Sequence, residues 1–170
     1  PNGIKGNKSA VAETIANSVR SKIIKEHLND PAFYDKMSAL LKEILDDLKA
    51  KRISYEQFLK KVAEQVIKPV QRGVADDTPK QLDTPGKRAL YSNLKPARDP
   101  YSGDSLRDGD DDPVMRLALA IDMIVKQVRP ADWRGVTARE NIIKEALLPI
   151  LFEETEVERV FLILTAQTEY

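Results

Sequence analysis

The sequence contains no cysteine and only one histidine. Without cysteine the chain forms no disulfide bond and no thiolate metal site. His27, beside Lys25 and Glu26 on a helical stretch, is expected to lie on the surface, and neither a cysteine nor an elbow-type serine accompanies it. The chain therefore offers little material for nucleophilic catalysis.

Long apolar runs are also missing. No run approaches the roughly 20 residues needed to span a bilayer, and the start lacks a signal-peptide pattern. Charged residues make up 32% of the chain and hydrophobic residues 42%, which is typical of globular rather than disordered proteins. We predict a cytoplasmic protein. Because the chain begins at Pro1, we also expect it to be a piece of a larger one.

The charges balance overall but not along the chain. There are 27 basic and 27 acidic residues in total, whereas residues 1–75 contain 14 basic and 9 acidic ones. The matching negative excess is concentrated in residues 99–112 and in the "EETEVE" stretch. Two parts of opposite net charge favour a chain that is oriented on its partners by these charges over a simple nucleic-acid-binding domain.

Apolar residues recur with helical spacing along nearly the whole chain, and no stretch is typical of a strand. We predict an all-α single domain, residues 1–170, of about seven helices. Its N-terminal part, 9–72, forms three antiparallel helices, with inward positions that include Val11, Ile23, Met37, Leu41, Phe58 and Leu59. A loop-rich middle, 73–112, contains one short helix, and C-terminal helices occupy 113–170.

Capping signals indicate where several of these helices begin. A serine or threonine followed three residues later by Glu or Gln occurs at Ser54, at Thr137 and, in "TEVE", at Thr155. Thr84 before Pro85 predicts a capped short helix, and Pro149 is expected to kink or end its helix.

Phosphate and metal motifs are incomplete. "GIKGNKS" and "TPGKRA" contain parts of a phosphate-binding loop but lack its spacing and preceding strand. Asp108, Asp110 and Asp112 alternate as at the start of a calcium loop, but Pro113 stands where glycine is needed. We favour a solvated loop whose last aspartate, Asp112, caps the next helix. No catalytic, cofactor-binding or metal-binding residue is therefore expected in this chain.

Five stretches in order resemble one family: "AETIANSVRSKIIKEH", "DPAFYDKMSALLKEIL", "ISYEQFLKKV", "TPGKRALYSNL" and "DWRGVTARENIIKEAL". Together with the closing "TAQTEY" they resemble the C-terminal region of the motor and nuclease (R) subunit of type I restriction endonucleases. The resemblance extends from about Ala12 to the end of the chain.

The resemblance implies a role in a larger enzyme. In that family the R subunit is an ATP-dependent DNA translocase and endonuclease, with its nuclease domain and two helicase lobes N-terminal to this region. ATP and Mg would belong to that parent chain, and no cofactor to this fragment. The C-terminal region is linked with docking onto the modification and specificity subunits, and double-stranded DNA is a possible further partner.

Two basic clusters are candidate DNA contacts. Asn17, Arg20, Lys22 and Lys25 share the first predicted helix, where they could follow a phosphate backbone. Lys87 and Arg88 stand at a helix N-terminus, whose dipole also favours phosphate. An ordinary solvated face, with Arg20 paired to an acidic residue, explains the same pattern.

The only tryptophan lies in a charged turn, "ADWRGVTAREN". Trp133, Arg134 and Arg139 are candidate partner-interface residues, because Trp and Arg dominate interface hot spots. The alternative, which we favour, is that Trp133 covers the core with its N–H on a loop carbonyl, while Arg134 pairs with an acidic neighbour.

Three functions remain open at this point. The first is an assembly domain of the R subunit that also guides duplex DNA. The second is a helical protein-interaction module with no nucleic-acid role. The third is a small ligand-binding or metal-binding protein built on the Asp-rich loop.

Overall fold

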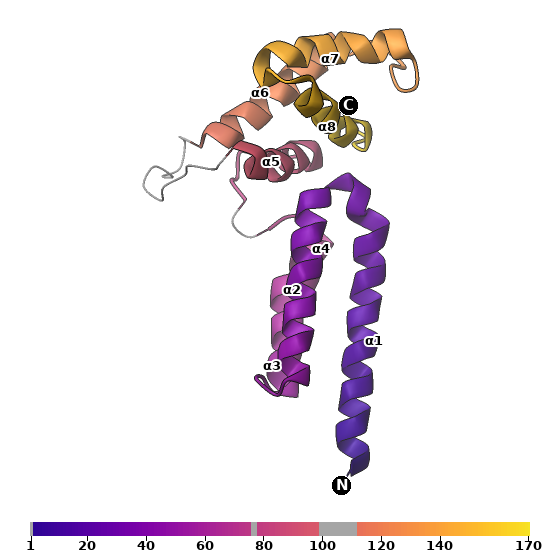
Figure 1. Cartoon of the computed structure of the whole chain (residues 1–170), viewed down its shortest axis with the longest axis vertical. Helices are drawn as coiled ribbons and strands as arrows, with labels where there is room; N and C mark the ends of the chain where they lie inside the picture. The colour runs from indigo at the N-terminus through magenta and orange to yellow at the C-terminus, as the bar shows by residue number, and fades with distance from the viewer. Residues whose placement is uncertain (1, 76–77, 99–111) are drawn as a thin grey trace. The chain divides into compact units, whose positions relative to one another are not determined.

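The computed structural model describes residues 2–75, 78–98 and 112–170, which form helices joined by turns and no strand (Figure 1). They divide into two compact units, residues 1–27 with 31–76 and residues 28–30 with 77–170. Within the described residues there are seven continuous helices, if α3, η2 and α4 are counted as one. The predicted all-α class and the number of helices are confirmed.

The first unit is the predicted group of three helices. It consists of α1 (Asn2–Glu26), α2 (Pro31–Lys49) and a third helix made of α3 (Tyr55–Val62), η2 (Ala63–Ile67) and α4 (Lys68–Arg72). α2 packs against both α1 and the third helix. Its core is built from Ala12, Ala16, Ile23, Phe33, Tyr34, Met37, Leu41, Ile44, Leu45, Phe58, Val62, Val66 and Val70.

Two predicted inward positions in this unit are wrong. Val11 is 39% exposed and Leu59 is 38% exposed. Besides Ile23, the buried side chains described on α1 are those of Ala12 and Ala16, which are short enough for α1 to pack against α2.

The third helix contains one wide turn. η2 is a π-helical segment in which the N–H of Lys68 bonds to the carbonyl of Ala63, five residues back. Pro69 follows directly and has no N–H to donate. The extra residue in the turn lets the chain pass a proline without ending the helix.

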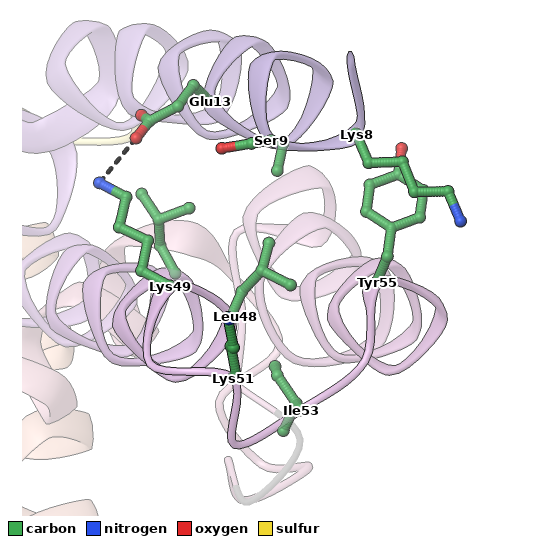
Figure 2. Close-up of a pocket in the computed structure, with 10 residues that line it drawn as sticks. Lys8, Ser9, Glu13, Leu48, Lys49, Lys51, Ile53 and Tyr55 are labelled. Atoms are coloured by element: carbon green, nitrogen blue, oxygen red, sulfur yellow. Dashed lines mark ion pairs between the residues drawn. The ribbon is translucent and has the colours of Figure 1, made fainter. Parts of the chain in front are cut away.

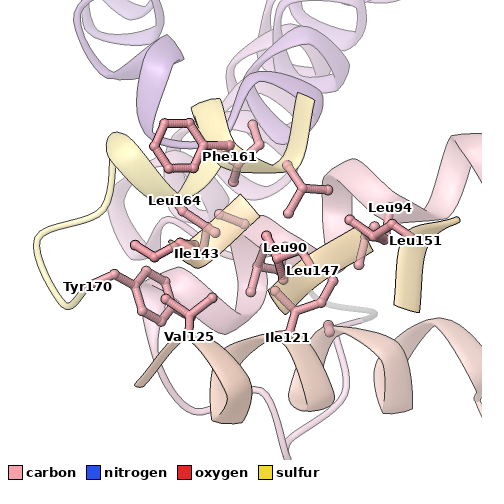
Figure 3. Close-up of a cluster of buried hydrophobic side chains, with 14 of the residues drawn as sticks. Leu90, Leu94, Ile121, Val125, Ile143, Leu147, Leu151, Phe161, Leu164 and Tyr170 are labelled. Carbon is pink, nitrogen blue, oxygen red and sulfur yellow. The ribbon is translucent and has the colours of Figure 1, made fainter. Parts of the chain in front are cut away.

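The second unit contains four helices, α5 (Pro85–Arg98), α6 (Pro113–Val128), α7 (Thr137–Leu151) and α8 (Glu154–Thr165). Each packs against two of the others: α5 and α7 both contact α6 and α8. Figure 3 shows the enclosed core, to which all four helices contribute; its fully buried members include Leu90, Leu94, Ile121, Val125, Ile143, Leu147 and Leu164. The 3₁₀ turn η1 (His27–Asn29) precedes α2.

Three of the five predicted helix caps are confirmed. Ser54 and Gln57 form the full capping box at α3. Asp112 caps α6, accepting N–H bonds from Val114 and Met115. Thr84 accepts a bond from the N–H of Lys87, at 3.3 Å.

The capping boxes at Thr137 and Thr155 are wrong, because both helices begin earlier. The N–H of Glu140 bonds to the carbonyl of Val136, which makes Thr137 the first helical residue. α8 begins at Glu154, since only Glu153 separates it from the left-handed residue Phe152 that ends α7. Pro149 lies inside α7, two residues before this end.

Two helices end on a left-handed residue that is not glycine. Lys51 has φ 61° after α2, and Phe152 has φ 67° at the end of α7. The N–H of Lys51 bonds to Leu48 and that of Arg52 to Asp47, which is the six-to-one pattern of a Schellman ending. Glycine takes this conformation without strain, whereas other residues lose about 1 kcal/mol there.

Lys51→Gly and Phe152→Gly are each expected to raise the free energy of unfolding by about 0.5–1 kcal/mol, because glycine relieves the left-handed strain. Phe152 is 77% exposed, so little packing is lost with its ring. Denaturant titration measures the change. Glu145→Gly, in the exposed interior of α7, is the matched control and should lower stability by about 0.5–1 kcal/mol. A loss of stability in the first two variants would contradict the assigned backbone.

Candidate functional site

The candidate site is the turn between α6 and α7, which carries Trp133. The indole is 2% exposed and meets Phe161 edge to face, with ring centroids 5.5 Å apart. Its Nε1–H donates to the backbone carbonyl of Tyr170 at 3.0 Å. The tryptophan is therefore a core residue that fastens the turn to the last residues of the second unit.

Three exposed arginines surround this turn, and each donates to backbone carbonyls. Arg134 stacks on the indole at 4.5 Å and reaches the carbonyls of Thr165 and Gln167. The interpretation that Arg134 pairs with an acidic neighbour is therefore wrong, because the nearby C-terminal turn presents free carbonyls instead.

The other two arginines follow the same pattern. Arg139 donates to Ala131 at 3.1 Å and to Asp132 at 3.2 Å. Arg129 donates to the carbonyl of Tyr170 at 3.0 Å and to that of Glu169.

These bonds fix the guanidinium groups in place. Within the part of the chain that the structure describes, no Asp or Glu side chain forms an ion pair with any of the three arginines. Two of them, Arg129 and Arg134, border a hollow of about 610 Å³, whose other lining residues are Pro130, Ala131, Asp132, Trp133 and Tyr170. An anionic group on a partner can meet two fixed, positively charged guanidinium groups there.

Tyr170 forms part of the wall of this hollow and is 5% exposed. Its hydroxyl donates to Asp122 Oδ1 at 2.6 Å, and Lys126 Nζ lies 2.9 Å from the same carboxylate. Glu169 accepts the N–H of Gly86, where an added Cβ would stand 2.7 Å from the Tyr170 ring. Glycine at position 86 thus permits the C-terminal residues to lie directly on α5.

This network predicts a loss of stability at alkaline pH. Burial, then the bond to Asp122, raises the pKa of the Tyr170 hydroxyl. The bond to Asp122 also raises the pKa of Lys126. A raised folded-state pKa contributes stability that is complete below the unfolded pKa, about 10 for both groups, and is lost as the pH rises above it. Denaturant titrations from about pH 8 to about pH 11 should show a decline in the free energy of unfolding that is smaller in Tyr170→Phe.

The candidate DNA-contact residues of α1 lie on an open face. Lys22 and Lys25 are exposed and form no ion pair within the described residues. Arg20 donates to Asn17 Oδ1 at 2.9 Å. Its charge also contributes to lowering the pKa of Glu13, for which the bond from Lys49 is the main cause.

The second cluster, at the start of α5, is engaged within its own unit. Lys87 pairs with Asp83 at 2.8 Å, and its bond lowers the pKa of that carboxyl. Arg88 Nη1 donates to the carbonyl of Leu82 at 3.2 Å, and its Nε is buried. The α1 face is thus the more accessible of the two candidate DNA contacts.

The Asp-rich loop is only partly described. Asp108 and Asp110 lie outside the described residues, whereas Asp112 accepts the Tyr91 hydroxyl at 2.7 Å besides capping α6. Among residues 2–75, 78–98 and 112–170, no group of acidic or histidine side chains is placed to hold a metal ion. In the same ranges no helix is long and apolar enough to cross a membrane.

Sequence reasoning missed two residues that complete the site. Arg129 follows the last turn of α6, where a basic residue is the ordinary complement to a helix end, so this signal was present. Tyr170 is a lone aromatic in a polar, non-periodic stretch, and no local pattern indicates its burial.

Comparison of the chain with protein-family models, with curated proteins and with solved structures gave no significant match.

Proposed function

We propose that this chain is a non-catalytic protein-docking domain, the C-terminal domain of the R subunit of a type I restriction enzyme. It joins the motor to the modification and specificity subunits. ATP and Mg act elsewhere in the parent chain, in the helicase and nuclease parts that the sequence resemblance implies.

The observation that carries the docking role is the arginine triad of the tryptophan turn, Arg129, Arg134 and Arg139. Each guanidinium is anchored by main-chain oxygens, and within the described residues none is paired with an Asp or Glu side chain. Anchored arginines lose little side-chain entropy when they bind a carboxylate, and arginine is enriched at interface hot spots. The partner surface is therefore expected to be acidic.

Variants of Arg139 in the complete R subunit test this role. Arg139→Gln removes the charge, and we expect it to weaken binding to the methyltransferase core about tenfold, mainly through the rate of association at low salt. Arg139→Lys keeps the charge and should retain most of the affinity. Equal affinity of Arg139→Gln and the unchanged subunit in a titration would contradict docking through this turn.

Duplex DNA is a further proposed partner, favoured by the open basic face of α1. Lys22→Gln and Lys25→Gln together remove two charges that would contact phosphates. The slope of the logarithm of the DNA-binding constant against the logarithm of the salt concentration should become shallower by about two. Lys60→Gln with Lys61→Gln, on α3, is the control for charge alone. An unchanged slope would favour the alternative, a protein-interaction module with no nucleic-acid role.

A further inference from the structure

A second recess lies in the first unit, where α1, the end of α2 and the α2–α3 turn meet. Its volume is about 470 Å³, within the range of sites that hold a ligand. Figure 2 shows Leu48, Ile53 and Tyr55 facing into it from three sides, and Ala12 and Leu45 complete its apolar lining. The recess is large enough for an aromatic side chain.

The rim of this recess is cationic. Lys49 pairs with Glu13 at 2.6 Å, and Lys8 lies 3.8 Å from Glu56. Lys51, also on the rim, is exposed and has no ion pair among the described residues. The lining thus has more positive than negative charge, which favours an occupant with carboxylates.

The second unit presents a group with the matching properties. Phe152 is 77% exposed, although burial of an aromatic side chain is strongly favourable. Glu153 and Glu154 follow it, both exposed and without an ion pair among the described residues. An aromatic ring flanked by carboxylates therefore stands at the end of α7.

The backbone gives a second reason to connect the two features. Lys51 on the rim and Phe152 at the end of α7 both occupy left-handed helix ends, where glycine is the unstrained residue. At both positions glycine would give the more stable fold. A role of the side chain in binding explains why lysine and phenylalanine stand there instead.

We propose that this chain associates with a second copy of itself, with Phe152 of one copy inserted into the lysine-rimmed recess of the other. Glu153 and Glu154 then meet Lys49 and Lys51. The contact joins the first unit of one copy to the second unit of another, so it is head-to-tail and goes beyond the proposed docking on other subunits. One aromatic anchor with charged flanks is a small interface, and the dissociation constant is expected on the order of 10–100 µM.

Sedimentation velocity of the 170-residue chain over about 1 µM to 1 mM, at low and high salt, tests the contact. We expect concentration-dependent association that salt weakens. Phe152→Gly and Ser9→Trp, which fills the recess from its exposed edge, should each raise the dissociation constant at least about tenfold. Lys51→Gly should raise it about threefold. Both glycine variants suit the left-handed backbone, so misfolding does not explain their effect.

A mixing experiment separates this contact from any other mode of association. Phe152→Gly keeps an open recess and Ser9→Trp keeps the phenylalanine, so an equal mixture of the two should form heterodimers although each variant alone does not. Met123→Ala removes a different exposed apolar side chain and should associate like the unchanged chain. A monomer at all concentrations, association unaffected by the two variants, or a mixture that fails to associate would each overturn the proposal.

Discussion

Trp133→Ala is expected to lower the free energy of unfolding of the second unit by about 3–5 kcal/mol. The indole is almost fully buried and closes the core against Phe161. Its loss leaves a cavity, removes the surface on which Arg134 stacks and leaves the Tyr170 carbonyl without the indole donor. Urea titration followed by circular dichroism measures the change.

Two further variants serve as controls for Trp133→Ala. Trp133→Phe keeps most of the apolar volume but loses the N–H. It should lower the free energy of unfolding less than Trp133→Ala does, with about 1–2 kcal/mol of its loss due to the missing hydrogen bond. Met123→Ala, at a side chain that is 56% exposed, should stay within about 0.5 kcal/mol. A Trp133→Ala loss as small as that of Met123→Ala would mean that the tryptophan is not part of the core.

The second large effect is expected from Tyr170→Ala, at about 3–5 kcal/mol. The ring is buried between α5 and α6, and its hydroxyl bonds to Asp122, which is itself only 6% exposed. Removing the side chain both opens a cavity and deprives a buried carboxylate of a donor, leaving Lys126 as its charged partner. The same denaturant titration measures it.

Tyr170→Phe distinguishes the two contributions. It retains the ring and removes only the bond to Asp122, so we expect a loss of about 1–2 kcal/mol. Since this variant also lacks the tyrosine titration, its stability should change less above pH about 10. Equal losses for the alanine and phenylalanine variants would place the energy in the hydrogen bond and not in packing.

Helical periodicity was sufficient to predict the fold class. The apolar repeats over 31–50 and 113–128 correspond to α2 and α6, because each helix buries one continuous face. Caps were less predictable, since a capping box depends on where the preceding turn ends. Gly135, with φ 78°, precedes α7, and Phe152, with φ 67°, precedes α8. As a result α7 begins at Thr137 itself and α8 at Glu154, in each case too early for the threonine to be the cap.

The candidate site was predictable only in its local part. Trp133, Arg134 and Arg139 stand out in one charged turn, but Trp133 and Arg134 contact residues that lie more than 30 positions later in the sequence. No single-sequence pattern connects a turn with Tyr170. The recess of the first unit escaped prediction for the same reason, because its apolar lining combines α1, α2 and the turn before α3.

The measurement that tests the proposed docking role most directly compares the proposed parent protein, a type I R subunit, with and without these 170 residues. Each form is titrated against its methyltransferase core in a mass-photometry assay at fixed salt, with ATPase activity as the control for an intact motor. We predict that the shortened subunit keeps its ATPase activity and no longer joins the core. Assembly of the shortened subunit with unchanged affinity would contradict a docking role for this domain.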